Sequence, residues 1–243
     1  MRQVTSRPLR LFVPALFFIA WVAALPLATV AQNISAPEAP VNPPAHPITQ
    51  QQLQSLFERF GTAEAQKAFV RDTYEKRRSQ LPAWFPQSIW DEAIEKVANL
   101  DTLPIALPVY QKYVSQETAN TLLLFFDGDT GKQLAHAWTE HGLQAMNQGY
   151  RGGNAALKAE DLMGKDPDVD SLMSKRLNEL TPQQGTSCLD ALQTFNLYIA
   201  RINDEKNAVY MAKVQEIARK VIDEHKAELD AAQRAAAHSA PAQ

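Results

Sequence analysis

The residues best suited to acid–base chemistry lie close together in the middle of the chain. His136 and Glu140 are four residues apart, and His141 follows directly. On a helix, the histidine and the carboxylate would share one face, where a proton could pass between them and a substrate. The same spacing is that of an ordinary surface ion pair, which we take as the primary interpretation. An enzyme that combines these three residues with others distant in the sequence stays the alternative.

The single cysteine, Cys188, is a second possible reactive group. It begins an apolar seam whose members are spaced by 4, 3, 4 and 3 residues, the period of one helix face. We therefore predict a small buried core residue, with a redox thiol or an intermolecular disulfide as the alternatives. One cysteine cannot form an internal disulfide, so apolar burial must hold the fold. The seam consists of Cys188, Leu192, Phe195, Ile199 and Ile202.

Two acidic segments resemble the start of a calcium-binding loop but lack its end. Counted from Asp127, the twelfth position, where an EF-hand needs an acid, is Trp138. Counted from Asp166, it is Leu177. The five histidines have no H-x-x-x-H spacing, and Gly131-Lys132 lacks the partner residues of a phosphate-binding P-loop. The sequence therefore predicts neither a metal nor a cofactor.

The charge of the chain is mildly acidic, with 24 basic and 27 acidic residues and a formal net charge of −3. This balance provides no basic surface for nucleic acid, so we expect no nucleic-acid partner. The basic clusters at residues 76–78 and 175–176 are short and flanked by acids. We expect both clusters to be solvated helix faces.

The N-terminus has the three-part organisation of a secretory signal peptide. Three arginines precede an apolar run over residues 11–30, and small residues then lead to a predicted cut between Ala31 and Gln32. Cleavage there would give a periplasmic or secreted protein. The apolar run also approaches the length of a membrane span, so a leader retained as an anchor is the alternative. That anchor would be the only contact with a membrane.

The rest of the chain is predicted to be all-α, a bundle of short antiparallel helices with longer C-terminal helices. Residues 32–48 are rich in proline, which predicts a disordered linker. A helical domain is expected over residues 49–180, a C-terminal helical region over 181–237, and a disordered tail over 238–243. Capping residues and prolines mark the expected helix starts, at Thr49, Thr62, Ser88, Pro104, Ser115, Thr130 and Thr181.

Two regions interrupt the helical pattern. Three glycines in five positions favour a loop over residues 149–154, with a glycine-rich helix as the alternative. In the C-terminal region, the seam from Cys188 and a second seam from Tyr210 to Val221 are out of phase across the polar run 203–207. We expect two antiparallel helices that turn at this run. One long helix that absorbs the slip as a stutter is the alternative.

One segment resembles a named family. Pro108 and Tyr110 precede a capped helix that ends in Phe125-Phe126, and Gly131-Lys132 follows closely. These residues and their spacing resemble the signature of the DUF2059 family, with a match over residues 103–165. The resemblance implies an exported, helical bacterial protein whose biochemical function is not established. It supplies no catalytic residue.

The same segment can be interpreted without the family, whose usual serine-proline turn is replaced here by residues 127–130. Neighbouring residues on a helix point about 100° apart, so the two phenylalanines cannot easily both point inward. We expect one to pack on Tyr110 or Tyr113 and the other on Trp138. The glycine would let the next helix begin close to its neighbour, and the lysine would stay solvated. The segment is therefore predicted to be a packing motif.

The sequence as a whole favours an exported, non-enzymatic protein that binds a partner. The partner is either an unidentified envelope protein or a second copy of the chain. A membrane-tethered helical scaffold is one alternative, if the leader is retained. An envelope enzyme with a site assembled from distant residues is the other.

Overall fold

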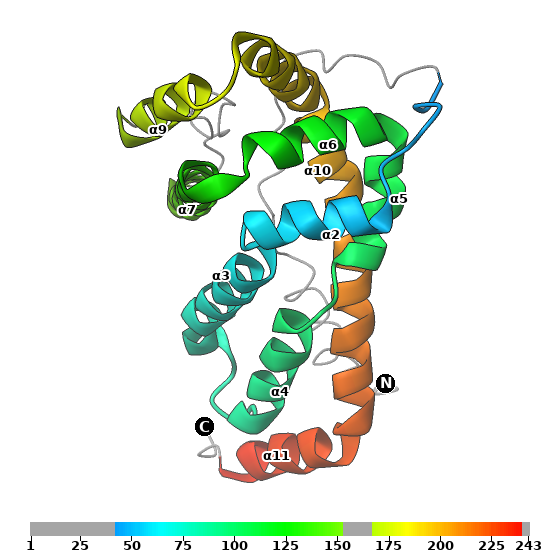
Figure 1. Cartoon of the computed structure of the whole chain (residues 1–243). Helices are drawn as coiled ribbons and strands as arrows, with labels where there is room; N and C mark the ends of the chain where they lie inside the picture. The colour runs from blue at the N-terminus through cyan, green and yellow to red at the C-terminus, as the bar shows by residue number, and fades with distance from the viewer. Residues whose placement is uncertain (1–41, 153–166, 240–243) are drawn as a thin grey trace, which may run out of the picture.

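Helices make up nearly all of the chain that the structure, a computed structural model, describes (Figure 1). It describes residues 42–152 and 167–239, and within these ranges there is no strand, only an isolated bridge between Pro47 and Ser115. The predicted all-α fold is confirmed. The elements are α2 (Gln50–Arg59), α3 (Thr62–Arg77), the 3₁₀ helix η1 (Arg78–Gln80), α4 (Gln87–Ala98), α5 (Leu103–Tyr113), α6 (Gln116–Phe125), α7 (Gly128–Gly152), α9 (Pro167–Asn178), α10 (Pro182–Glu224) and α11 (Lys226–Ser239).

Side-chain caps fix three of the predicted helix starts. The Thr49 hydroxyl accepts a hydrogen bond from the Gln52 backbone N–H at 3.2 Å, and the Gln52 side chain accepts one from the Thr49 N–H at 2.9 Å. Thr181 and Gln184 form the same reciprocal box before α10, and Ser115 caps α6. Each such cap stabilises its helix by about 1 kcal/mol. Local sequence therefore determines where these helices begin.

Helix α7 differs from the prediction at both ends. It begins at Gly128, two residues before Thr130, and Gly128 has a φ of 70°, which allows the sharp turn after α6. The helix then continues to Gly152, so the loop predicted over 149–154 is wrong for residues 149–152. Extending a formed helix adds one hydrogen bond per residue, which offsets the cost of about 1 kcal/mol per glycine. Residues 153–154 lie outside the described chain.

The 43 residues of α10 form one continuous helix. The turn expected at residues 203–207 is therefore wrong, and the alternative of one long helix holds. Between Ile202 and Val214, both fully buried, the buried face turns by about a third of a revolution at about 100° per residue. The two seams are out of phase because the two halves of the helix bury different faces, which needs no change in chain direction.

Two hydrophobic cores lie along α10. The first core gathers side chains of α2, α5, α6, α7, α9 and the N-terminal half of α10, and the second core gathers those of α3, α4 and its C-terminal half. Helix α10 therefore joins the two cores. Figure 1 shows α10 running along the molecule beside both groups of helices. The fully buried side chains include Ile48, Leu53, Phe125, Phe126, Leu134 and Ile202 in the first core, and Ile89, Trp90, Val97, Val214 and Val221 in the second.

The last residues of the predicted linker pack against the helices. Ile48 is fully buried, and its N–H donates to the Val114 carbonyl at 2.9 Å. The Gln116 N–H donates to the His46 carbonyl at 2.8 Å. The linker prediction is thus wrong at its C-terminal end, because an apolar side chain and paired backbone groups attach this segment beside α5 and α6. The predicted signal peptide, its cleavage site and the linker up to residue 41 lie outside the described chain.

Two arginines of the basic clusters are buried, which contradicts the prediction of solvated faces. Arg77 and Arg176 are each 8% exposed, whereas their neighbours Lys76 and Lys175 are exposed. Both arginines lie near the C-terminal ends of their helices, where a cation is favourable. The two basic clusters are therefore not uniform surface patches of positive charge, since one arginine of each is buried.

Arg176 closes the end of α6. Its guanidinium donates to the carbonyls of Phe125 at 2.8 Å and Leu124 at 2.7 Å, and it pairs with Glu179 at 2.8 Å. Glu179 also accepts a hydrogen bond from the Thr130 hydroxyl. The last carbonyls of a helix have no intrahelical donor, so Arg176 satisfies groups that burial would otherwise leave unpaired. Arg176 thereby ties α9 to α6, and Glu179 adds a link to Thr130 of α7.

Replacing Arg176 by methionine should destabilise the protein by about 2–4 kcal/mol, because the α6 carbonyls and Glu179 lose their donor while the apolar stem is retained. The free energy of unfolding in urea measures this. The matched control is Lys175→Met on the exposed neighbouring residue, which should change stability by less than about 0.5 kcal/mol. Equal effects of the two substitutions would show that the guanidinium contributes no specific stabilisation.

Candidate functional site

The residues of the predicted packing motif meet inside the first core. The Phe126 ring lies 4.7 Å from Phe60, 5.1 Å from Phe125 and 5.6 Å from Trp138, measured between ring centroids. The predicted contact with Trp138 is therefore present. Tyr110 instead meets Phe57 and Phe195, at 5.8 and 6.3 Å. The motif thus connects aromatic side chains of α2, α5, α6, α7 and α10.

Both phenylalanines point inward, contrary to the expectation that only one could do so easily. Phe125 is fully buried and Phe126 is 1% exposed. Phe126 follows the last residue of α6, and its backbone (φ −90°, ψ 13°) no longer has α-helical geometry. The chain therefore no longer imposes the 100° separation of helix neighbours. Among the ring contacts of the described chain, Phe125 meets Phe126 and neither of the expected tyrosines.

The remaining motif residues have structural positions. Pro108 lies inside α5, which continues through it, and burial raises the pKa of Tyr110 to about 12. A Cβ placed on Gly131 would lie 2.6 Å from the Phe126 carbonyl carbon and 2.8 Å from the Phe125 oxygen. Lys132 is exposed. The glycine therefore allows α7 to pass against the end of α6.

Replacing Gly131 by alanine should destabilise the protein by about 1–3 kcal/mol, since the new methyl group would meet backbone atoms that cannot move aside cheaply. Thermal and urea unfolding measure the change. Gly185→Ala is the matched control on another buried helical glycine, where the nearest heavy atom would be 3.9 Å away. That control should be neutral or stabilising by up to about 1 kcal/mol. A neutral Gly131→Ala would contradict the close-contact interpretation.

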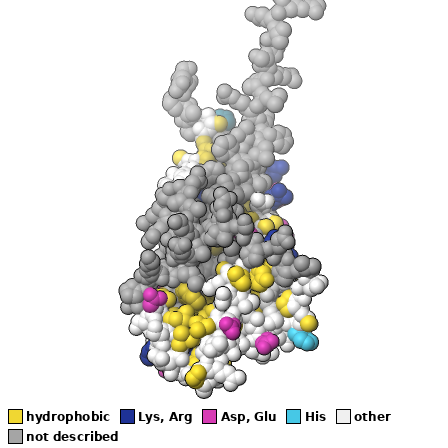
Figure 2. Space-filling view, turned by 90° about the horizontal axis from the view of Figure 1, so that it is seen from above, with side chains coloured by type: hydrophobic (Ala, Val, Ile, Leu, Met, Phe, Trp, Pro, Cys, Tyr) yellow, Lys and Arg dark blue, Asp and Glu magenta, His cyan; other side chains and the backbone are white. Residues whose placement is uncertain are grey.

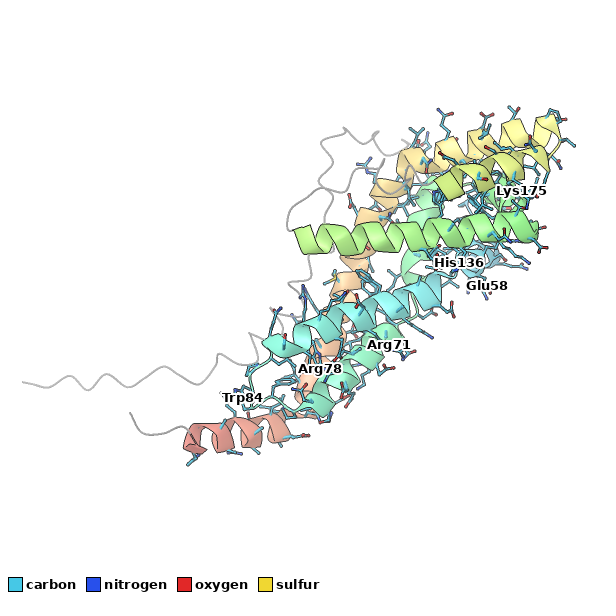
Figure 3. The ribbon with its side chains drawn as sticks, turned by 90° about the vertical axis from the view of Figure 1, so that its left-hand side faces the viewer. Glu58, Arg71, Arg78, Trp84, His136 and Lys175 are labelled. Carbon is cyan, nitrogen blue, oxygen red and sulfur yellow. The ribbon has the colours of Figure 1, made fainter. Side chains whose placement is uncertain are left out.

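The candidate acid–base residues lie on the surface of α7, where Figure 3 labels His136. The His136 Nε2 is 3.4 Å from the Glu140 Oε1, and the two side chains are 73% and 61% exposed. The side chain of His141 lies outside the described chain. An exposed pair of this kind is worth at most a few tenths of a kcal/mol. The geometry is that of a surface ion pair.

Cys188 is a buried core residue, as predicted. Its Sγ lies 3.8 Å from the Thr121 carbonyl oxygen, and burial raises the pKa of the thiol. A neutral, buried thiol is a poor nucleophile.

Asp127 of the first acidic segment pairs with Arg59 at 2.8 Å. Within the described chain, no three His, Cys, Asp or Glu side chains are arranged to hold a metal ion.

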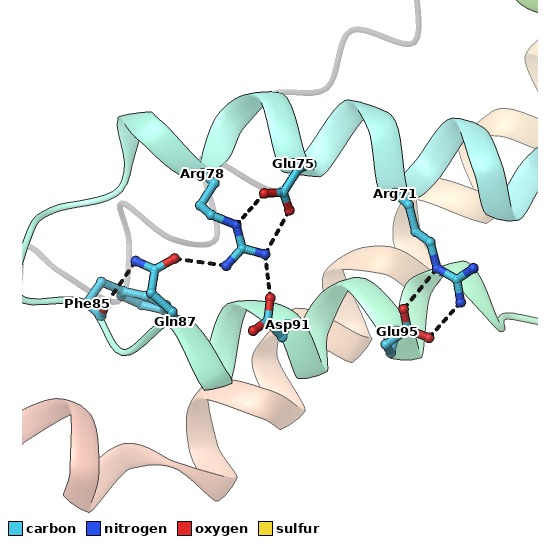
Figure 4. Close-up of polar contacts among 7 residues, drawn as sticks. All are labelled: Arg71, Glu75, Arg78, Phe85, Gln87, Asp91 and Glu95. Carbon is cyan, nitrogen blue, oxygen red and sulfur yellow. Dashed lines mark hydrogen bonds and ion pairs between the residues drawn. The ribbon is translucent and has the colours of Figure 1, made fainter.

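Ion pairs fasten α3 to α4 (Figure 4). Arg71 donates two hydrogen bonds to Glu95, both at 2.9 Å, and these hold the pKa of that carboxyl below its usual value. Arg78 bonds Glu75 at 2.8 Å and also pairs with Asp91. The guanidinium groups are thus occupied by carboxylates of the chain itself. This cluster holds two helices side by side.

A histidine lies where α10 ends and α11 begins. The His225 Nε2 is 2.7 Å from Glu92 of α4, and its Nδ1 is 3.3 Å from Glu228 of α11. A neutral imidazole has one N–H, so only the protonated ring can donate to both carboxylates. The hydrogen bond to Glu92 is the main cause that raises the pKa of His225. Sequence spacing could reveal Glu228, three residues away, but not Glu92.

The charged neighbours of His225 also connect the three helices. Lys96 bonds Glu92 at 2.7 Å and Glu224, the last residue of α10, at 2.8 Å. Because folding raises the pKa of His225, its stabilising contribution is fully present below about pH 6.5, the usual pKa of an unfolded histidine. The contribution is lost as the pH rises through the higher pKa of the folded state.

Replacing His225 by glutamine should lower the melting temperature at pH 5.5 and have a smaller effect at pH 8.5. The difference between wild type and variant, followed by thermal unfolding across this range, isolates the contribution of the imidazolium. His238→Gln in α11 is the control, since His238 is exposed and its ring lies against the Arg234 backbone carbonyl, with no carboxylate bonded to it among the described residues. A His225 effect that does not depend on pH would contradict the assignment.

The surface of α10 is divided into an uncharged and a charged half. Residues 182–200 contain one charged residue, Asp190, whereas residues 201–224 contain ten. Leu189 and Leu197 are 46% and 52% exposed in the uncharged half. Figure 2 shows that hydrophobic side chains reach the surface in groups beside the residues drawn in grey. The exposed side chains of the uncharged half, named here the neutral face, are Pro182, Gln183, Gln184, Thr186, Ser187, Leu189, Asp190, Gln193, Thr194 and Leu197.

The neutral face was missed by the sequence analysis, although part of its signal is present there. The scarcity of charge over residues 182–200 can be read from the sequence. The exposure of two leucines within it cannot, because apolar residues on a long helix are expected to be buried. In interfaces between proteins, the buried centre is depleted of charged residues. The arrangement is therefore suited to binding another protein.

Comparisons with models of protein families, with curated proteins and with solved structures find no match to this chain. The resemblance to the DUF2059 family accordingly has no support beyond the residues on which it was based. Fold and surface geometry are the remaining basis for a function.

Proposed function

We propose that this chain is an exported, non-enzymatic helical protein that binds another protein through the neutral face of α10. The observation that carries the proposal is the combination of two half-exposed leucines with a nearly uncharged surface over residues 182–200. Other exposed stretches of the described helices, such as α3 and the second half of α10, are rich in charged residues.

The energetics of burial favour this face. Full burial of a leucine side chain contributes about 1.5–3 kcal/mol, so covering the remaining half of Leu189 and Leu197 would contribute roughly 1 kcal/mol each. Amides and hydroxyls cost far less to remove from water than charges, and they can form hydrogen bonds with a partner. The neutral face therefore offers a gain on binding with a small desolvation penalty.

Export is proposed from the leader. The arginines, the apolar run and the small residues before Gln32 support passage across a membrane followed by cleavage. No helix within the described ranges has both the length and the apolar character needed to cross a membrane. A periplasmic or secreted location follows from cleavage, and a tethered scaffold would follow from retention of the leader.

The mass of the intact native protein in separated cell fractions tests export. We expect a soluble envelope species that begins at Gln32. A full-length species in the inner-membrane fraction would replace this proposal with the tethered scaffold. Recovery of the full-length chain from the cytoplasmic fraction alone would contradict export altogether.

Site-specific photocrosslinking tests the binding face. A photoreactive amino acid in place of Leu197 should form covalent adducts with a protein in living cells. The same residue in place of Lys220, which is exposed on the charged half of α10, is the control. Adducts from position 197 that do not exceed those from position 220 would contradict binding through the neutral face.

A further inference from the structure

We infer that the partner of the neutral face is a second copy of this chain, bound through an antiparallel pair of α10 helices. This inference rests on the proposed binding function and names its partner. It is carried by the positions of the exposed residues along α10, by their charge, and by the size of the face.

Four exposed residues of the neutral face form a further seam on α10, named here the exposed seam. Thr186, Leu189, Gln193 and Leu197 are spaced by 3, 4 and 4 residues, and all four are exposed. This spacing places them along one side of the helix. Cys188, Leu192, Phe195 and Ile202 of the seam from Cys188 face the first core instead. The N-terminal half of α10 therefore carries one buried seam and the exposed seam.

The exposed seam is complementary to itself. In an antiparallel pair with its twofold axis at Gln193, Leu189 lies opposite Leu197 of the second copy, and Leu197 lies opposite its Leu189. The two Gln193 side chains meet on the axis, where one amide can donate to the carbonyl of the other. A twofold interface requires such self-complementarity, since each copy contributes the same surface.

The charges at the ends of the seam fit the same arrangement. Asp204, which is exposed, follows Leu197 by seven residues and so continues the seam. In the antiparallel pair it lies opposite Pro182 of the second copy, at the positive N-terminal end of that copy's α10, where a carboxylate is favourable. Asp190, the one charge within residues 182–200, lies opposite Asn196 and not opposite an acid. Two acidic chains can therefore pair without like charges in contact.

The size of the face sets the strength of the pair. Residues 182–204 span about 35 Å of helix, and one helix face of this length buries a few hundred Å² per copy. A stable interface of standard size buries about 800 Å² per partner. We therefore expect a weak dimer, with a Kd of about 10–100 μM, that depends on concentration.

Sedimentation velocity of the purified protein over roughly 1–500 μM, a range chosen to bracket the expected Kd, tests the pair. The wild-type sedimentation coefficient should rise with concentration, and Leu197→Lys should weaken association at least tenfold. Lys220→Ala, on the charged half of α10, should leave association unchanged. Circular dichroism and thermal unfolding verify that both variants are folded. A wild-type protein that is monomeric over the whole range would overturn the inference.

A disulfide crosslink tests the register. Gln193→Cys should form a covalent dimer under mild oxidation, because the residue meets its own counterpart on the axis. Lys220→Cys is the control, and wild type provides a second one, since Cys188 is buried. Equal crosslinking at positions 193 and 220 would overturn the pairing. If the purified protein does not pair while position 197 crosslinks to a different protein in cells, the inference fails and the proposed function stands.

Discussion

The burial of two different faces of α10 is the constraint on which the rest of the structure depends. Its N-terminal half contributes Cys188, Leu192 and Ile202 to the first core, and its C-terminal half contributes Val214 and Val221 to the second. A helix of this length is not stabilised by its own hydrogen bonds alone, so packing on both sides must hold it. The remaining helices are arranged as two groups that cover these two faces.

Close packing around the end of α6 follows from this arrangement. The chain must leave α6 and enter α7 within a few residues while both phenylalanines stay buried, which requires a glycine at position 131. The carbonyls exposed by the helix end then need a donor inside the protein, and Arg176 provides it. At the C-terminal end of α10, His225 and Lys96 connect α4, α10 and α11 through carboxylates. Polar groups thus fix the positions of helices that apolar burial only brings together.

The distribution of charge on the surface of α10 follows the same division into two halves. Its C-terminal half carries many charges, some of which bond neighbouring helices, such as Glu205, which pairs with Lys112 at 2.6 Å. Its N-terminal half has almost no charge and exposes leucines, although it covers a well-packed core on its other side. Stability does not require this composition, since charged residues are common on exposed helix faces. The proposed binding surface would account for it. Of the reactive side chains suggested by spacing, His136 and Glu140 lie at the surface and Cys188 lies in the core.

The sequence by itself determined the all-α class, the capped starts of α2, α6 and α10, and the burial of Cys188, because caps and periodicity act over a few residues. The spacing of the residues from Thr186 to Leu197 and the scarcity of charge around them are equally local, whereas the exposure of the two leucines among them is known only from the structure. Only the tertiary structure decided that α10 continues through residues 203–207, that Arg176 is buried and that Ile48 packs. Each of these depends on groups distant in the sequence: a second core on another face, open carbonyls of α6, and a neighbouring backbone. Local patterns cannot reveal such partners, since folding alone brings them together.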